Sequence, residues 1–217
     1  MVTLARVPRC RLVPDLRRRL VQLLLGLIAA GVGIALVVRS DLGLGPWDVL
    51  HQGIAERTNI PMGMVVIAVG VVVLAAWLPL RQRLGVGTIL NVLVVGTVLD
   101  LSLAVLPEAG GLVVRGGLLV AGVVAVGLGS GLYLGTGLGP GPRDGLMTNL
   151  AARGSSIRLV RTGIELSALL LGWALGGTVG IGTVVFALAI GPLVQLFLAR
   201  FTMVAGPVPA LAETAHR

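Results

Sequence analysis

The chain has 217 residues, of which 56% are hydrophobic and only 12% are charged, and its mean hydropathy is +1.01. Because a soluble domain usually carries about 25% charged residues, this chain has too few charges to solvate the surface of a globule of its size. A soluble enzyme and a disordered protein are therefore excluded, and a membrane protein with several spans is indicated. The net charge is +8, and all 17 basic residues are arginine.

Six apolar segments are long enough to cross a bilayer, since a hydrocarbon core about 30 Å thick needs roughly 20 apolar residues as a helix. Backbone groups in lipid must be satisfied within the segment, which favours helices over open strands. The expected spans are Leu20–Val38, Pro61–Leu80, Gly87–Leu106, Leu118–Gly135, Leu159–Gly176 and Gly182–Ala199. The first is too long for a typical signal peptide and lacks a good cleavage site, so we expect it to be retained.

The positions of the arginines predict the orientation, because cytoplasmic connections are enriched in basic residues. With six spans, most arginines fall on one side of the membrane, and Arg39, Arg57 and Arg115 are left on the other. Both termini are therefore predicted to be cytoplasmic, and the Arg-rich tail to attract anionic lipid head groups. The charge of +8 is explained as a topology signal, so the bilayer is the expected partner and no nucleic acid is expected.

The two halves of the chain carry matching residues at a nearly constant spacing. In the first part of the repeat each residue lies 96 positions before its counterpart, as Gly43 lies before Gly139, and the offset then falls to 95. Because Pro, Asp and Trp are scarce here, we interpret the matches as an internal duplication. The matched pairs are Gly43 and Gly139, Gly45 and Gly141, Pro46 and Pro142, Asp48 and Asp144, Trp77 and Trp173, Gly85 and Gly180, Gly87 and Gly182, and Thr88 and Thr183.

The predicted fold is all-α, with about six transmembrane helices arranged as two inverted three-helix repeats. Three spans per half is an odd number, so the second copy runs in the opposite direction across the membrane. Many secondary transporters are built in this way, with their sites at the interface between the repeats. The repeats are assigned to residues 20–110 and 111–201, between an Arg-rich cytoplasmic tail at 1–19 and a C-terminal cytoplasmic tail at 202–217.

Each half contains a Gly-x-Gly-Pro-x-Asp segment directly after its first span, ending at Asp48 and at Asp144. Glycine permits unusual backbone angles, proline suits the first position of a helix, and an acid in the first turn favours the helix dipole. The pattern predicts a break followed by a short, non-spanning helix, over Trp47–Arg57 and Arg143–Arg153.

Two interpretations of these paired segments stay open. In the first, each short helix lies at the membrane surface, and its aspartate only caps it. In the second, both loops re-enter the membrane and meet near its midplane, where they line a path for a solute or ion, with Arg143 as a partner for Asp48. The candidate substrate or ion site is then Gly43, Gly45, Pro46, Asp48, Gly139, Gly141, Pro142 and Asp144.

Four further polar residues are secondary candidates: His51, Asp100, Arg143 and Gln195. His51 follows Asp48 by three residues and shares its helix face, so it either has a proton-linked role or is incidental. Asp100 and Gln195 occupy equivalent positions, and they either face each other or Asp100 reaches toward the outer membrane surface. No metal cluster, cofactor motif or catalytic constellation is recognisable, so neither an enzyme, a metal nor a cofactor is expected.

The combination of motifs is similar to the YczE/YyaS/YitT-like group of bacterial integral membrane proteins. The resemblance covers about Leu20 to Phe201 and is carried by Ser-Asp-Leu-Gly-Leu-Gly-Pro-Trp-Asp-Val-Leu, by Gly-Pro-x-Asp-Gly-Leu and by the two Gly-x-Gly-Thr runs. It implies a multi-pass protein of the bacterial plasma membrane and assigns no substrate. The second copy has Arg143 where the first has Trp47, which departs from a strictly symmetric site.

Two functions follow as hypotheses of different classes. The first is a small-solute permease or exporter with its site between the inverted repeats. The alternative is a membrane scaffold or regulator that transports nothing and serves a partner such as a biosynthetic complex. No oligomeric state is predicted.

Overall fold

The structure is a computed structural model that describes residues 15–80, 84–151 and 156–203. Within these ranges it is all-helical, with eight α-helices and no strand. The predicted tails fall largely outside the described residues. The helices are α1 (Leu16–Ser40), α2 (Pro46–Thr58), α3 (Met62–Leu80), α4 (Val86–Val105), α5 (Leu112–Gly135), α6 (Pro142–Ala151), α7 (Ile157–Ala174) and α8 (Ile181–Phe201).

Four helices of the described chain, α1, α4, α5 and α8, are long and apolar enough to cross a membrane. A fifth span results if α2 and α3, which meet at 115°, are counted as one bent segment. The six predicted spans are thus found only in part. The difference lies partly in α7, which carries Arg158, Arg161 and Glu165. Arg161 and Glu165 form an ion pair one turn apart on this helix, with Nε and Oε1 2.9 Å apart.

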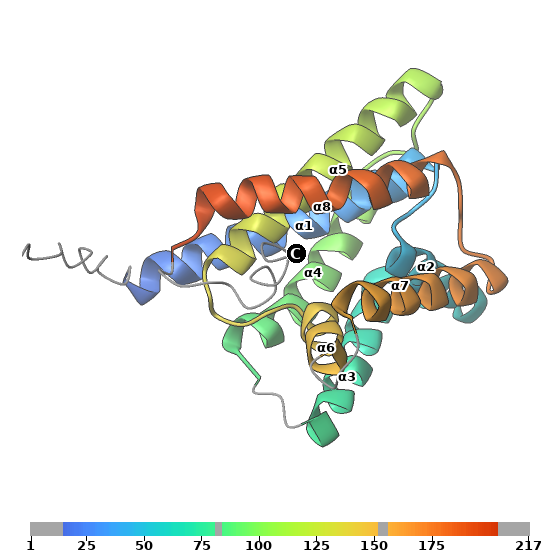
Figure 1. Cartoon of the computed structure of the whole chain (residues 1–217). Helices are drawn as coiled ribbons and strands as arrows, with labels where there is room; N and C mark the ends of the chain where they lie inside the picture. The colour runs from blue at the N-terminus through green and yellow to red at the C-terminus, as the bar shows by residue number, and fades with distance from the viewer. Residues whose placement is uncertain (1–14, 81–83, 152–155, 204–217) are drawn as a thin grey trace, which may run out of the picture.

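The centre of the molecule is α1, which packs against α5 and α4, while α8 covers the other side of α5 (Figure 1). α1 and α5 are antiparallel and touch through glycines. A Cβ atom on Gly129 would lie 2.5 Å from the carbonyl oxygen of Gly26, and one on Gly122 would lie 2.7 Å from that of Gly33. Small residues at these positions let the two backbones approach to contact distance, as in many membrane helix pairs.

The short helices pack across the two halves of the chain. α2 lies against α7, and α6 lies against α3, with further contacts between α3 and α4 (Figure 1). Trp77 of α3 is 1% exposed and donates a hydrogen bond from Nε1 to the carbonyl oxygen of Pro142, 3.2 Å away. Its counterpart in the repeat, Trp173 on α7, is 64% exposed. The contact of α2 with α7 and the contact of α6 with α3 thus involve matching helices, but the matching tryptophans differ in burial.

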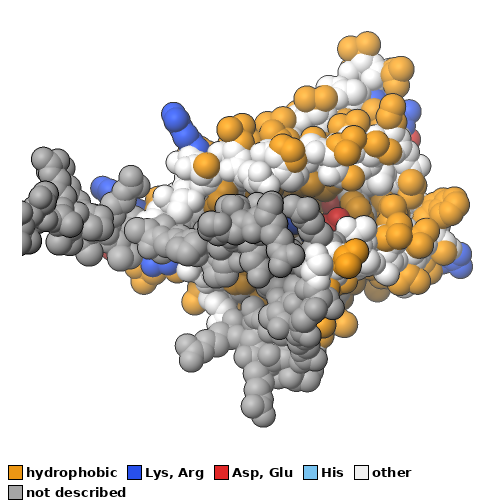
Figure 2. Space-filling model, in the orientation of Figure 1, with side chains coloured by type: hydrophobic (Ala, Val, Ile, Leu, Met, Phe, Trp, Pro, Cys, Tyr) orange, Lys and Arg blue, Asp and Glu red, His pale blue; other side chains and the backbone are white. Residues whose placement is uncertain are grey.

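The outer surface is strongly apolar. Hydrophobic side chains cover much of the described surface in Figure 2, and basic side chains lie mainly near its margins. Val113, Leu188 and Leu196 are among many large hydrophobic side chains that are more than half exposed. Contiguous exposed apolar surface of this extent is unfavourable in water and is expected for helices that face lipid tails.

Candidate functional site

The two Gly-Pro-x-Asp segments have the predicted local structure, a break followed by a short helix. Gly43 and Gly139, the equivalent glycines, have φ angles of 111° and 134°. Residues that carry a Cβ atom adopt such angles only with strain. α2 begins at Pro46 with Asp48 in its first turn, and α6 begins at Pro142 with Asp144 in its first turn. The backbone of the candidate site is thus repeated in the two halves.

Each break packs against the start of the last span of the other half. The amide of Gly182, at the start of α8, donates to the carbonyl oxygen of Leu42 at 2.7 Å, and the amide of Gly87, at the start of α4, donates to that of Leu138 at 3.0 Å. A Cβ atom on Gly43 would lie 2.5 Å from the amide nitrogen of Gly180. Each Gly-x-Gly-Thr run therefore forms the surface on which the break of the other half packs, and we call this surface its seat.

The equivalent threonines complete these seats. Thr88 donates a hydrogen bond from Oγ1 to the carbonyl oxygen of Pro140 at 2.7 Å, and a Cβ atom on Gly139 would lie 2.7 Å from the same Oγ1. Thr183 accepts a hydrogen bond on Oγ1 from the amide of Gly180 at 3.2 Å, and a Cβ atom on Gly43 would lie 2.7 Å from this Oγ1. Both breaks are held too tightly for any residue larger than glycine.

Asp48 lies in a group of side chains that we call the Asp48 cluster: the buried Asp48 and His51 and the partly buried Trp47 and Arg143. Asp48 is 5% exposed and His51 only 1% exposed. Oδ1 of Asp48 is 3.4 Å from Nδ1 of His51 and 3.8 Å from Nη2 of Arg143. The predicted partnership of Arg143 with Asp48 is thus matched by their separation, and it joins the first break to the second.

The remaining member, Trp47, connects the cluster to the second half through its ring. The guanidinium carbon of Arg143 lies 5.0 Å from the centre of the Trp47 ring, within the range of a cation–π contact. The Trp47 and His51 rings are 6.4 Å apart. Trp47 and Arg143 occupy the matching place, between the proline and the aspartate, of the two Gly-Pro-x-Asp segments, and their contact joins the two halves of the chain.

Three atoms of the Asp48 cluster are buried without a hydrogen-bond partner among the described residues: Nε1 of Trp47, Oδ1 of Asp48 and Nδ1 of His51. Each such group costs on the order of 1–3 kcal/mol relative to a satisfied one. Two of these atoms, on Asp48 and His51, lie 3.4 Å apart, and buried polar atoms without a partner call for an explanation such as a bound ligand, ion or water.

The second aspartate has a different environment. Oδ2 of Asp144 accepts a hydrogen bond from the hydroxyl of Tyr133, 3.0 Å away. Tyr133 is 7% exposed, and a Cβ atom on Gly141 would lie 2.8 Å from its hydroxyl oxygen. The sequence interpretation missed Tyr133 as a site residue, although it is the single tyrosine of the chain and stands in an apolar span four residues before a glycine-rich break.

Two secondary candidates lie outside the cluster. Asp100 accepts hydrogen bonds from the amides of Gly63 at 2.6 Å and Met64 at 3.1 Å, so its carboxylate satisfies the free amides at the start of α3. Gln195 is exposed on α8. This placement favours a structural role for Asp100 over the predicted pairing of the two residues.

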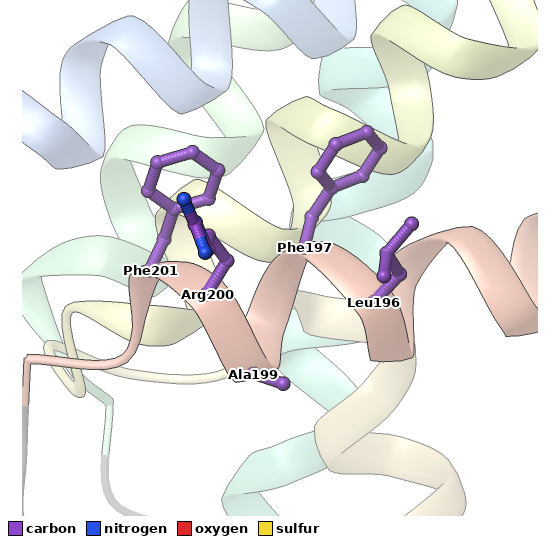
Figure 3. Close-up of a pocket in the computed structure, with 5 residues that line it drawn as sticks. All are labelled: Leu196, Phe197, Ala199, Arg200 and Phe201. Carbon is purple, nitrogen blue, oxygen red and sulfur yellow. The ribbon is translucent and has the colours of Figure 1, made fainter.

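A shallow hollow at the C-terminal end of α8 lies apart from both breaks in the chain. It is lined by Leu196, Phe197, Ala199, Arg200 and Phe201, all from one helix (Figure 3). No residue of the Asp48 cluster lines it, and its walls are almost wholly apolar. We therefore do not assign the candidate site to it.

The apolar helices and the buried cluster among them define a multi-pass α-helical membrane protein. The chain belongs to the family described as a family of unknown function (DUF6198), whose profile matches residues 17–199. It belongs with the YczE/YyaS-like proteins, which confirms the family suggested by its motifs.

Three relatives cover most of this chain. An uncharacterized protein of Haemophilus influenzae is 44% identical over 177 residues, which are 81% of either chain. The uncharacterized membrane protein YczE of Bacillus subtilis is 32% identical over 178 residues, 80% of this chain and 82% of its own. The uncharacterized protein YyaS of the same organism is 29% identical over 182 residues, 80% of this chain and 89% of its own. No solved structure gives a significant match.

Proposed function

We propose that the protein is a small-solute permease or exporter of the bacterial plasma membrane, with its site between two inverted repeats at the Asp48 cluster. The observation that carries the proposal is the separation of 3.8 Å between Asp48 of one break and Arg143 of the other. An ionisable side chain buried among membrane helices is costly and usually marks a substrate or ion path. In a site made by both halves, movement of one half against the other also changes the distance between Asp48 and Arg143.

The inverted repeat is supported by contacts that recur after exchange of the two halves. Gly26 contacts Gly129, and Gly33 contacts Gly122. Gly26 and Gly122 are counterparts 96 positions apart, and so are Gly33 and Gly129, so the two contacts are the same contact with the halves exchanged. In the same way, Gly31 meets Val98, and their counterparts Gly127 and Leu193 meet each other. Such reciprocal pairs are the signature of a two-fold relation between antiparallel helices.

The ends of α1 and α5 add a third reciprocal pair. Arg19 donates a hydrogen bond from Nε to the carbonyl oxygen of Thr136 at 2.8 Å, and its counterpart Arg115 donates from Nε to that of Ser40 at 2.8 Å. With cytoplasmic termini, these two arginines belong to opposite membrane surfaces. Reporter fusions after Glu108 and after Arg217 would lie on opposite sides, and the same side for both would contradict this orientation.

Transport is tested with purified protein in vesicles of bacterial lipid and a panel of labelled amino acids, sugars, nucleosides and organic cations. We expect at least one solute to enter faster than into protein-free vesicles, and Asp48→Asn to lower that rate by about tenfold or more. The control is Glu56→Gln, which changes an exposed side chain near the end of α2 and should leave the rate unchanged. Entry no faster than into protein-free vesicles, for every solute, would favour the scaffold hypothesis.

A further inference from the structure

We propose that Asp48 and His51 form a proton-binding site whose proton competes with Arg143 for the Asp48 carboxylate. This inference rests on the proposed transport function and deepens it, because it names the proton as the coupling ion.

Oδ1 of Asp48 and Nδ1 of His51 face each other at 3.4 Å on consecutive turns of α2. Neither atom has a hydrogen-bond partner within the described part of the chain, and both side chains are more than nine-tenths buried. The two atoms are thus the acceptor and donor positions of one hydrogen bond that is slightly too long. A hydrogen on His51 Nδ1, which the neutral ring carries in one of its two tautomers, lets a small shift close this bond and satisfies both atoms. A proton then taken up from water on Nε2 turns the ring into an imidazolium, whose charge the Asp48 carboxylate balances.

Few other charges face this pair. On α2 itself, Glu56 and Arg57 are exposed. On α7, which packs against α2, Arg161 and Glu165 pair with each other, and the side chain of Arg158 lies outside the described residues. The described side chains of α3, Met62–Trp77, include no charged group.

On α6, Asp144 is bound by Tyr133, which leaves Arg143 as the cation nearest to Asp48 among the described residues. Arg143 is held loosely enough to leave the carboxylate. Its side chain is 34% exposed, and its Nη2 lies 3.8 Å from Asp48 Oδ1, which is too far for a direct hydrogen bond. Its guanidinium also lies over the Trp47 ring, which offers it a second position.

A buried carboxylate needs one compensating positive charge, which either Arg143 or a bound proton can supply. Movement of the second half that draws Arg143 away from Asp48 therefore favours proton uptake, and its return favours release.

The second half lacks the parts for an equivalent site. The counterpart of His51 is Met147, a buried apolar side chain that carries no titratable proton. Asp144 already accepts a hydrogen bond from Tyr133, and the counterpart of Tyr133 is Val37. The inference is therefore one proton per chain, taken up at the first break.

The chain has two histidines, His51 and His216, so His216→Gln yields a protein in which His51 gives the single histidine signal. We would titrate this variant in lipid nanodiscs by histidine-selective NMR from about pH 5 to about pH 9, a range centred near the ordinary histidine transition. Asp48→Asn should lower the midpoint of His51, and Arg143→Gln should raise it, each by about one pH unit or more. The matched control, Glu56→Gln, removes an exposed acid from the same helix and should leave the midpoint in place.

An unshifted midpoint in both Asp48→Asn and Arg143→Gln would overturn the proton site, and it would leave the transport proposal standing because no solute is present in this measurement. Arg143→Lys guards against misfolding: it keeps the charge on a partly exposed side chain and should stay near the wild-type midpoint.

The coupling is tested in the vesicles used for transport. An inward proton gradient should change the rate of solute entry in the wild type, raising it for co-transport and lowering it for exchange. His51→Gln should abolish that change while entry without a gradient persists. Equal entry with and without a gradient in the wild type would overturn the proton as coupling ion.

Discussion

The first and second breaks share a backbone and differ in the side chains placed on it. Both have a glycine at positive φ, a proline that starts a short helix and an aspartate in the first turn. In the first break the aspartate faces a histidine and has an unpartnered oxygen, whereas in the second it is bound by Tyr133. The two breaks thus share a local backbone, while the buried atoms without a hydrogen-bond partner among their described residues belong to the first break and its helix.

The contrast also gives the two halves different roles. The second break contributes Arg143 to the Asp48 cluster, while its own aspartate is held by a tyrosine of the preceding helix. We interpret the first break as the binding half and the second as the half that supplies a movable counter-charge.

The largest expected effect tests what the breaks share. Gly43→Ala and Gly139→Ala each put a Cβ where backbone or threonine atoms already lie within 2.7 Å, at φ angles that alanine adopts only with strain. Each should destabilise the protein by about 3 kcal/mol or more, measured as a loss of melting temperature in detergent. Gly116→Ala is the control, because a Cβ there meets nothing within 4 Å. A large loss for one break and none for the other would show that the seats are not equivalent.

The sequence predicted the backbone of these breaks well, because Gly, Pro and an early acid restrict local conformation almost regardless of context. One of the two interpretations that the sequence left open, in which the breaks meet, made Arg143 a partner for Asp48, and the two side chains lie 3.8 Å apart. The six predicted spans are confirmed in part: four helices of the described chain are long and apolar enough to cross a membrane, or five if α2 and α3, which meet at 115°, are counted as one bent span. Tyr133 was missed because its link to Asp144 depends on how the chain turns between α5 and α6.

The next effect concerns what distinguishes the second break. Tyr133→Phe removes the hydroxyl that binds the Asp144 carboxylate at 3.0 Å and keeps the ring in place. We expect a loss of about 1.5–3 kcal/mol, the range for a hydrogen bond to a charged group. A double-mutant cycle with Asp144→Asn, followed by thermal unfolding in detergent, isolates the pairwise part. Additive losses would mean that Tyr133 does not hold Asp144, and the proposed difference between the breaks would fail.

The smallest effect compares the two ends of the α1–α5 pair. Arg115 donates to the carbonyl oxygens of Ser40 at 2.8 Å and Asp41 at 2.6 Å and also pairs with the Asp41 carboxylate. Its counterpart Arg19 donates to one carbonyl oxygen of the described residues, that of Thr136, and the counterpart of Asp41 is Gly137. Arg115→Gln should therefore cost about 1 kcal/mol more than Arg19→Gln.

Little of this difference should come from the Asp41 carboxylate, because that side chain is 69% exposed and water and salt screen its attraction for Arg115. The melting temperatures of Arg115→Gln, Arg19→Gln and Asp41→Asn in detergent at low and high salt separate the two contributions. Asp41→Asn should be nearly neutral, and the gap between the two arginine variants should persist at high salt because it comes from bonds to backbone carbonyls. Equal losses at the two ends would mean that the extra carbonyl adds nothing. The end of the α1–α5 pair at Arg115 would then be no more stable than the end at Arg19.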